Sequence, residues 1–254
     1  MTFTEPVRRV DGFTRFGKPT HHYVDGNDNK IPGVTTIIGD GLPKPALVGW
    51  GIKSVAEFAV NNWDDLADLP PTDQLKRLKG APYADRDEAA RRGTEVHALA
   101  ESLVNGGTVD VPTALAGHVE GYARWLEDWQ PEPILTETTV YNLTHGYAGS
   151  FDLLAQIGDD VWLLDVKTTR SGVYGDVAYQ LAAYVNAEKF LDDDGTAHDM
   201  LAVDKAGVIH VTATECRLVP VTVDATVFAE FLHIKEVAAA AKRSRSYVGE
   251  AVTA

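Results

Sequence analysis

The spacing of hydrophobic residues changes along this chain from a helical period to a strand period. Over residues 86–105, small and apolar residues recur every three or four positions, which predicts an amphipathic helix. A second helical segment is expected over residues 113–129. Apolar and polar residues then alternate, and the segments 134–142, 149–157 and 161–169 are predicted to form three consecutive strands. The middle of the chain therefore combines helices with a sheet.

The part of the chain before residue 86 is less regular. It mixes Gly, Pro and Asp with short apolar runs, such as IPGVTTII at residues 31–38. A helix is expected over residues 45–60. We predict an irregular lobe that folds against the rest of the protein.

The part that follows the three strands predicts further elements. We expect a helix near residues 175–190 and then a hairpin of strands 200–204 and 208–214, turning at 205–207. A final helix should run to Arg243, with Asp224 as its N-terminal cap.

This order of elements predicts an α/β fold in which helices flank a mixed central sheet. Neither an internal repeat nor a low-complexity linker marks a domain boundary. We therefore expect a single domain over residues 1–254. Its parts would be an N-terminal elaboration over residues 1–85, a core over 86–220, and a C-terminal helix and tail over 221–254.

Composition limits the class of protein. The chain has 254 residues, and no apolar run reaches the roughly 18 to 20 residues of a membrane span. The N-terminus lacks the apolar centre of a secretory signal, so we expect a soluble, cytoplasmic protein without a membrane partner. Cys216 is the only cysteine, so a metal site within one chain must use oxygen and nitrogen ligands.

The net charge is unfavourable for a protein that coats nucleic acid. The formal charge is -14, whereas binding to a phosphate backbone depends on Lys and Arg. A local basic groove and bound cations can still hold nucleic acid on an acidic protein. Candidate basic residues for such a groove are Arg91, Arg92, Arg170, Lys242, Arg243 and Arg245.

Charged residues gather on the second and third predicted strands. Asp152 lies near the start of one strand, and Asp165 and Lys167 are two residues apart on the next, so the latter two share a face. If the strands pair, two carboxylates and an ammonium converge among apolar neighbours. Carboxylates held so close repel each other unless a cation lies between them. A hard divalent metal ion would relieve this repulsion.

Each feature also has an ordinary explanation when it is taken alone. Asp165 and Lys167 could be a surface ion pair, and His97 a helical histidine with a structural partner. Gln180 and Tyr184 are four apart on the helix after the sheet, which also suits an amphipathic helix with a buried tyrosine. It is their order along the chain that favours a common site.

Four motifs occur in the order GTEVH, YAGSFD, LLDVKTT and YQLAAY. This set resembles the RecB-like branch of the PD-(D/E)XK nucleases, and in particular the stand-alone exonucleases encoded by phages. The resemblance covers about residues 86–190. The segment IPGVTTIIGDGLPKPALVGW also resembles the lead-in of these phage enzymes and of mitochondrial genome-maintenance exonucleases. The resemblance implies a restriction-endonuclease-like sheet.

The family pattern implies the roles of the site residues. His97, Asp152 and Asp165 would bind one or two Mg²⁺ or Mn²⁺ ions, with the backbone carbonyl of Val166 completing the inner shell. Lys167 would be the catalytic lysine, acting with Asp152 and Asp165.

Other residues match the family's DNA-positioning features. Gln180 and Tyr184 correspond to its Q-x-x-x-Y motif, and Thr169 follows the catalytic lysine as it does in many members. Glu137 on the first strand is a weaker ligand candidate. Some relatives hold an iron–sulfur cluster with four cysteines, and because this chain has only Cys216, we expect no such cluster.

The implied function is metal-dependent cleavage of DNA, as an exonuclease in phage or bacterial recombination, repair or replication. DNA is the expected partner, and a phage recombinase or single-strand annealing protein would be a further one. Two alternatives stay open: an inactive nuclease fold that binds DNA or a partner, and a metallohydrolase of small phosphate esters. The chain lacks a G-x-x-x-x-G-K-[ST] loop, so a motor activity would belong to another protein.

Overall fold

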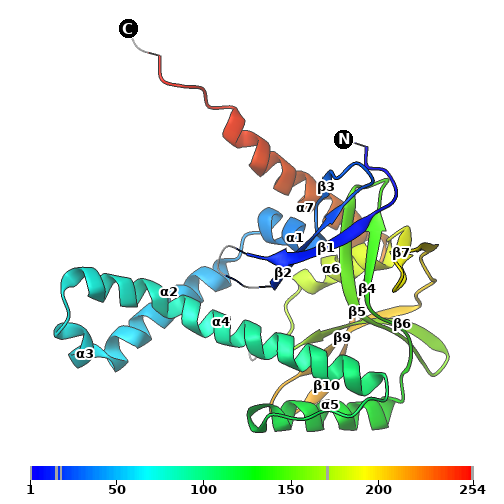
Figure 1. The fold of residues 1–254 in the computed structure, drawn as a ribbon, viewed down its shortest axis with the longest axis horizontal. Coiled ribbons are helices and arrows are strands. Elements are labelled where there is room, and N and C mark those ends of the chain that lie inside the picture. The colour runs from blue at the N-terminus through cyan, green and yellow to red at the C-terminus, as the bar shows by residue number, and fades with distance from the viewer. Residues whose placement is uncertain (1, 15–16, 18, 170–171, 253–254) are drawn as a thin grey trace.

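The structure is a computed structural model that describes residues 2–14, 17, 19–169 and 172–252. Its centre is a seven-stranded mixed sheet with helices on both faces, and a three-stranded sheet lies beside it (Figure 1). The predicted α/β fold, with a central sheet between helices and a helix near the C-terminus, is therefore confirmed. Arg170, a candidate for the basic groove, lies outside the described residues.

The strand order in the central sheet is β10-β9-β6-β5-β4-β7-β8. The three predicted strands are confirmed as β4, β5 and β6, joined by two antiparallel pairings. Strand β6 pairs with β9 in parallel, which makes the sheet mixed. The bounds are β4 Glu132–Asn142, β5 Tyr147–Ile157, β6 Asp160–Lys167, β7 Lys189–Leu191, β8 Ala197–Asp199, β9 Lys205–Val211 and β10 Cys216–Val221.

The predicted hairpin at residues 200–214 is wrong in register. Residues 205–207 were expected to form its turn, but they begin β9, and the true hairpin joins β9 to β10. A side chain at Gly207 would lie 3.0 Å from Leu218 and 3.1 Å from the Val219 carbonyl. The glycine thus permits close strand packing, where the sequence suggested a turn.

One face of the sheet is covered by α1 (Val34–Gly41), α6 (Asp176–Val185) and α7 (Ala225–Arg243). The predicted cap of the last helix is confirmed, because the Asp224 side chain accepts hydrogen bonds from the backbone N–H groups of the helix's first turn. The predicted helix at 175–190 is shorter than expected.

The opposite face is covered by the second half of α4 (Pro71–Val104) and by α5 (Ala116–Trp129), which follows a 3₁₀ turn at Thr113–Leu115. The helix predicted to start at residue 86 begins at Pro71 and contains Pro82. A proline normally ends or kinks a helix, so the sequence favoured the later start.

The first half of α4 extends from the body with α2 (Pro45–Asn61) and α3 (Trp63–Ala67) as a helical arm (Figure 1). The helix predicted over residues 45–60 is confirmed as α2. Several large apolar side chains of the arm are exposed, among them Val60 and Trp63.

The N-terminal region is more regular than predicted. Strands β1 (Arg8–Phe13), β2 (Pro19–Val24) and β3 (Lys30–Ile31) form an antiparallel sheet that lies across β4 and β5 (Figure 1). Tyr23 packs with Tyr141 in a small apolar core beneath it. Among the described residues, no helix has both the length and the apolar character of a membrane span.

Candidate active site

The candidate site lies where β5 and β6 separate. Their antiparallel ladder ends at the pair Leu153 and Leu164, so Asp152 and Asp165 would form the next pair. In place of a ladder partner, the backbone N–H of Val166 donates to Asp152 Oδ2 over 2.6 Å. The fork between the strands thus holds two carboxylates, one from each strand.

Asp165 and Lys167 lie on the same face of β6, as their spacing predicted, and they form an ion pair. Lys167 Nζ lies 2.5 Å from Asp165 Oδ2, and Asp165 is only 1% exposed. Burial and the charge of Asp152 raise the pKa of Asp165 to about 6, although Lys167 opposes the shift. Burial alone would lower the pKa of Lys167, but Asp165 raises it above its ordinary value. The lysine therefore stays protonated.

His97 reaches the fork from α4. Its Nδ1 atom lies 3.4 Å from Asp152 Oδ2. Burial would lower the pKa of His97, but the hydrogen bond and charge of Asp152 raise it above its ordinary value. Burial would raise the pKa of Asp152, but His97, Lys167 and the Val166 N–H together lower it. Asp152 is therefore the carboxylate that stays ionised.

Glu137 joins these two residues from β4. One potential ligand atom each of His97, Glu137 and Asp152 lies within 4.8 Å of the others. Glu137 has a left-handed backbone, with φ 46°, within a strand, which is unusual for a residue with a side chain. Loss of hydration and the charge of Asp152 raise the pKa of Glu137 to about 7, while His97 and Arg9 oppose the shift.

The structure thus brings together a group of potential metal ligands that differs from the predicted set. His97 and Asp152 are present as predicted, and Glu137, the weaker candidate, completes the group. Asp165 directs its oxygens to Lys167 and Gln180. The Val166 N–H faces Asp152, and because N–H and C=O of one strand residue point to the same side, its carbonyl faces the fork too.

These residues fit a hard divalent cation. The donors are carboxylate oxygen and imidazole nitrogen, which suit Mg²⁺ or Mn²⁺. Asp165 Oδ2 is buried and, apart from its ion pair with Lys167, makes no hydrogen bond of regular geometry within the described residues. The ion pair with Lys167 supplies the positive charge that such a buried oxygen requires.

The three residues predicted to bind substrate differ in how close they lie to Asp165 and in how exposed they are. Gln180 Nε2 donates to Asp165 Oδ1 over 2.7 Å and lies 3.5 Å from the Tyr184 hydroxyl. Tyr184 is 2% exposed and packs so closely on Gly149 that a side chain there would overlap its ring. Thr169 is exposed and donates to the carbonyl of Gly172 over 2.6 Å. Gln180 therefore orients Asp165, and Tyr184 lies behind it.

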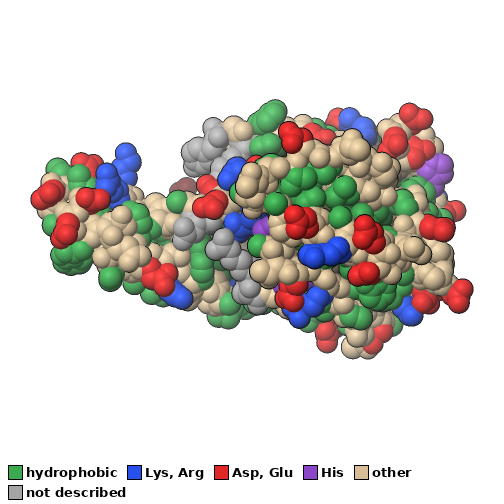
Figure 2. All heavy atoms as spheres, turned by 90° about the horizontal axis from the view of Figure 1, so that it is seen from below, with side chains coloured by type: hydrophobic (Ala, Val, Ile, Leu, Met, Phe, Trp, Pro, Cys, Tyr) green, Lys and Arg blue, Asp and Glu red, His purple; other side chains and the backbone are tan. Residues whose placement is uncertain are grey.

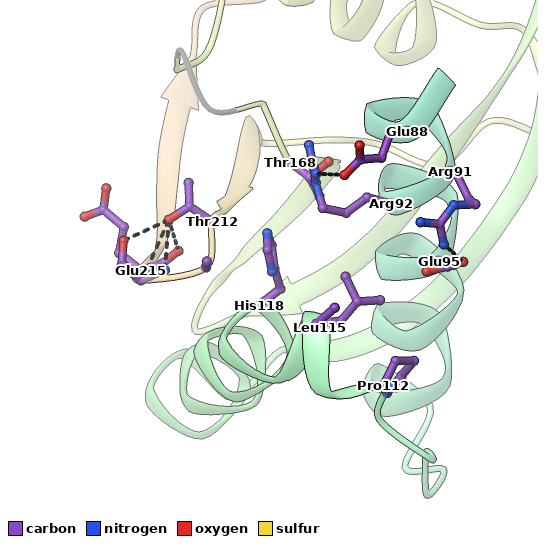
Figure 3. Close-up of a pocket in the computed structure, with 13 residues that line it drawn as sticks. Glu88, Arg91, Arg92, Glu95, Pro112, Leu115, His118, Thr168, Thr212 and Glu215 are labelled. Carbon is purple, nitrogen blue, oxygen red and sulfur yellow. Dashed lines mark hydrogen bonds and ion pairs between the residues drawn. The ribbon is translucent and has the colours of Figure 1, made fainter. Parts of the chain in front are cut away.

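A cleft of about 650 Å³ lies between α4, α5 and the β9–β10 turn, and Thr168, the residue after Lys167, is among its lining residues (Figure 3). Arg91 and Arg92 of α4 line it, but they pair with Glu95 at 2.9 Å and Glu88 at 3.9 Å. Figure 2 likewise shows acidic and basic side chains interspersed over one face of the molecule. Of the other groove candidates, Lys242 pairs with Asp40 over 2.9 Å.

Sequence reasoning did not single out several supporting residues. His210 on β9 is 3% exposed, and its Nε2 atom lies 2.7 Å from the Thr169 carbonyl, which ties down the segment after Lys167. Its only signal in the sequence was an isolated histidine in an apolar strand. Ser150, two residues before Asp152, carried no signal.

No known family model matches this chain, and a search of curated proteins gives no match. The function of the site has therefore to be inferred from its own residues and geometry.

Proposed function

We propose that this protein is a divalent-metal-dependent nuclease of the PD-(D/E)XK type that hydrolyses phosphodiester bonds in DNA. The observation that carries the proposal is the fork between β5 and β6, where His97, Glu137 and Asp152 gather beside the buried Asp165–Lys167 pair. The four motifs that resemble the RecB-like branch support the same conclusion.

In this proposal His97, Glu137 and Asp152 would hold the metal ion, beside the Asp165–Lys167 pair. A bound divalent ion supplies Lewis-acid stabilisation and lowers the pKa of a water molecule. Lys167, kept protonated by Asp165, offsets negative charge that develops on the phosphate. Gln180 fixes the orientation of Asp165 so that the lysine keeps its position.

The proposal is tested by incubating the protein with linear and circular DNA in EDTA, Mg²⁺ or Mn²⁺. We expect cleavage with the metals and none in EDTA, and loss of cleavage in Asp165→Asn. Undiminished cleavage in EDTA would remove the mechanism. Binding of metal and DNA without cleavage would instead identify an inactive nuclease fold.

A further inference from the structure

The N-terminal hairpin presents charged side chains to the central sheet. In the β1–β2 register, Arg9 pairs with Tyr23 and Asp11 pairs with His21, so these four side chains share one face of the hairpin. That face meets β5 at Ser150: the Tyr23 hydroxyl lies 3.1 Å and Arg9 Nη1 3.5 Å from Ser150 Oγ.

This contact places Arg9 beside the proposed metal ligands. Ser150 and Asp152 are two residues apart on β5, so their side chains point to the same face, with roughly 6.5 Å between the two positions along the strand. Arg9 is also one of the charges that act on Glu137, where it opposes the rise of that carboxyl's pKa.

The guanidinium group of Arg9 retains donors for a ligand. Its Nε atom pairs with Asp11 Oδ1 over 3.0 Å. The two terminal nitrogens carry the remaining N–H donors, and one of them, Nη1, lies next to Ser150. The side chain is 32% exposed. A guanidinium presented in this way matches the geometry of a phosphate, to which it can donate two parallel hydrogen bonds.

A polyanionic substrate needs such a cation at this position. The carboxyl groups of Glu137, Asp152 and Asp165 gather at the fork, where Lys167 pairs with Asp165, and the chain as a whole carries -14. Arg91 and Arg92 of α4 pair with glutamates of the same helix. Arg9 therefore supplies positive charge on the side of the hairpin.

We propose that Arg9 binds a phosphate group of the substrate strand that flanks the phosphate undergoing cleavage. This inference rests on the proposed nuclease function and adds to it a contact outside the metal site. Arg9 is here a substrate-positioning residue that the hairpin presents beside Ser150.

The experiment compares Arg9→Ala with Arg8→Ala, a matched control. Arg8 is the neighbouring residue on the opposite face of β1, where it pairs with Asp28. Binding of a labelled single-stranded oligonucleotide is measured against NaCl concentration, with Mn²⁺ present, in an Asp165→Asn background that prevents cleavage.

We expect Arg9→Ala to weaken binding roughly 5- to 20-fold at low salt and to reduce the slope of log Kd against log salt by about one. Arg9→Lys should restore most of the affinity, and Arg8→Ala should behave like its parent. In the cleaving enzyme, Arg9→Ala should raise KM more than it lowers kcat.

A second variant tests the same contact in the other direction. Asp11→Ala removes the carboxylate that competes for Arg9, so DNA binding should tighten. An Arg9→Ala protein that binds with unchanged affinity and salt slope, while melting like its parent, would overturn the inference. If the wild-type protein never cuts DNA but its binding still depends on Arg9, the nuclease proposal fails and the phosphate contact stands.

Discussion

Asp152 and Asp165 lie on opposite sides of the fork between β5 and β6, and their surroundings shift their pKa values in opposite directions. The pKa of Asp152 is lowered below its ordinary value, whereas that of Asp165 is raised to about 6. Without a metal ion, one carboxylate is therefore readily ionised and the other is ionised at a cost to the fold.

The first prediction concerns the stability of the metal-free protein. The pKa of Asp165 is about 6 when folded and near 3.8 when unfolded, so the folded protein binds the extra proton between these values. Stability should thus fall as pH rises from about 4 to 6, by roughly 2–3 kcal/mol from this group. The raised pKa of Glu137, about 7, extends the decrease in the same direction.

Asp152 affects the stability of the folded protein in a different pH range. Its lowered pKa contributes stability that is present above pH 4 and lost only at lower pH, so it does not cancel the decrease. Urea unfolding in EDTA between pH 4 and pH 8 measures the effect. Asp165→Asn should flatten the dependence and should be more stable than wild type at pH 8. Equal pH profiles for the two proteins would contradict this account.

The second prediction concerns Glu137 as a metal ligand. Glu137→Gln removes one of three potential ligands, so the Kd for Mn²⁺ should rise at least about tenfold by calorimetric titration. Its metal-free stability at pH 8 should increase, because a carboxylate beside Asp152 has been neutralised. Glu132→Gln, an exposed change on the same strand, is the control. Unchanged Mn²⁺ affinity in Glu137→Gln would exclude it from the ligand group.

The sequence predicted the part of the site that depends on local spacing. Asp165 and Lys167 share a face because they are two apart on a strand, and this was readable from alternation alone. The position of the Glu137 side chain was harder to predict. It depends on a left-handed backbone conformation, which glutamate rarely adopts and which its presence in the sequence therefore does not indicate.

The elements of the fold were predicted correctly where hydrophobic and polar residues alternate clearly. The prediction failed where tertiary contacts determine the local structure. Strands β4, β5 and β6 alternate clearly, and all three were found. The turn expected at residues 205–207 was wrong because parallel pairing with β6 holds that segment extended. The β1–β2 hairpin was missed because its exposed polar strands lack an apolar alternation.

The third prediction concerns Gln180 and Tyr184. Gln180→Ala leaves Asp165 Oδ1 without its amide donor, and kcat should fall about tenfold as the Asp165–Lys167 pair loses its fixed orientation. Tyr184→Phe removes only a 3.5 Å contact and should change kcat much less. Steady-state cleavage rates measure both, with Gln156→Ala as control, a half-buried glutamine at the far end of β5 whose side chain donates to the Gly158 carbonyl. A larger fall in kcat in Tyr184→Phe than in Gln180→Ala would contradict the prediction that Gln180 matters more than the Tyr184 hydroxyl.

The last prediction separates a catalytic role of Lys167 from a structural one. Lys167→Ala should lower kcat by roughly 10² to 10⁴, as expected for the loss of a group that stabilises charge or transfers a proton. The affinity for Mn²⁺ should change little, because Lys167 is a cation and belongs to no ligand group. The control is Lys205→Ala, since Lys205 forms a similar but exposed pair with Asp160 over 2.6 Å and should leave kcat unchanged.

The same variant should also affect the fold, because Lys167 is the partner of a buried carboxylate. Above pH 6, where Asp165 ionises, metal-free Lys167→Ala should melt at a lower temperature than wild type, and below pH 6 the difference should shrink. The double variant Lys167→Ala/Asp165→Asn should regain stability at pH 8 without regaining cleavage. A stable Lys167→Ala protein that binds Mn²⁺ and still cuts DNA at the wild-type rate would refute the role assigned to this lysine.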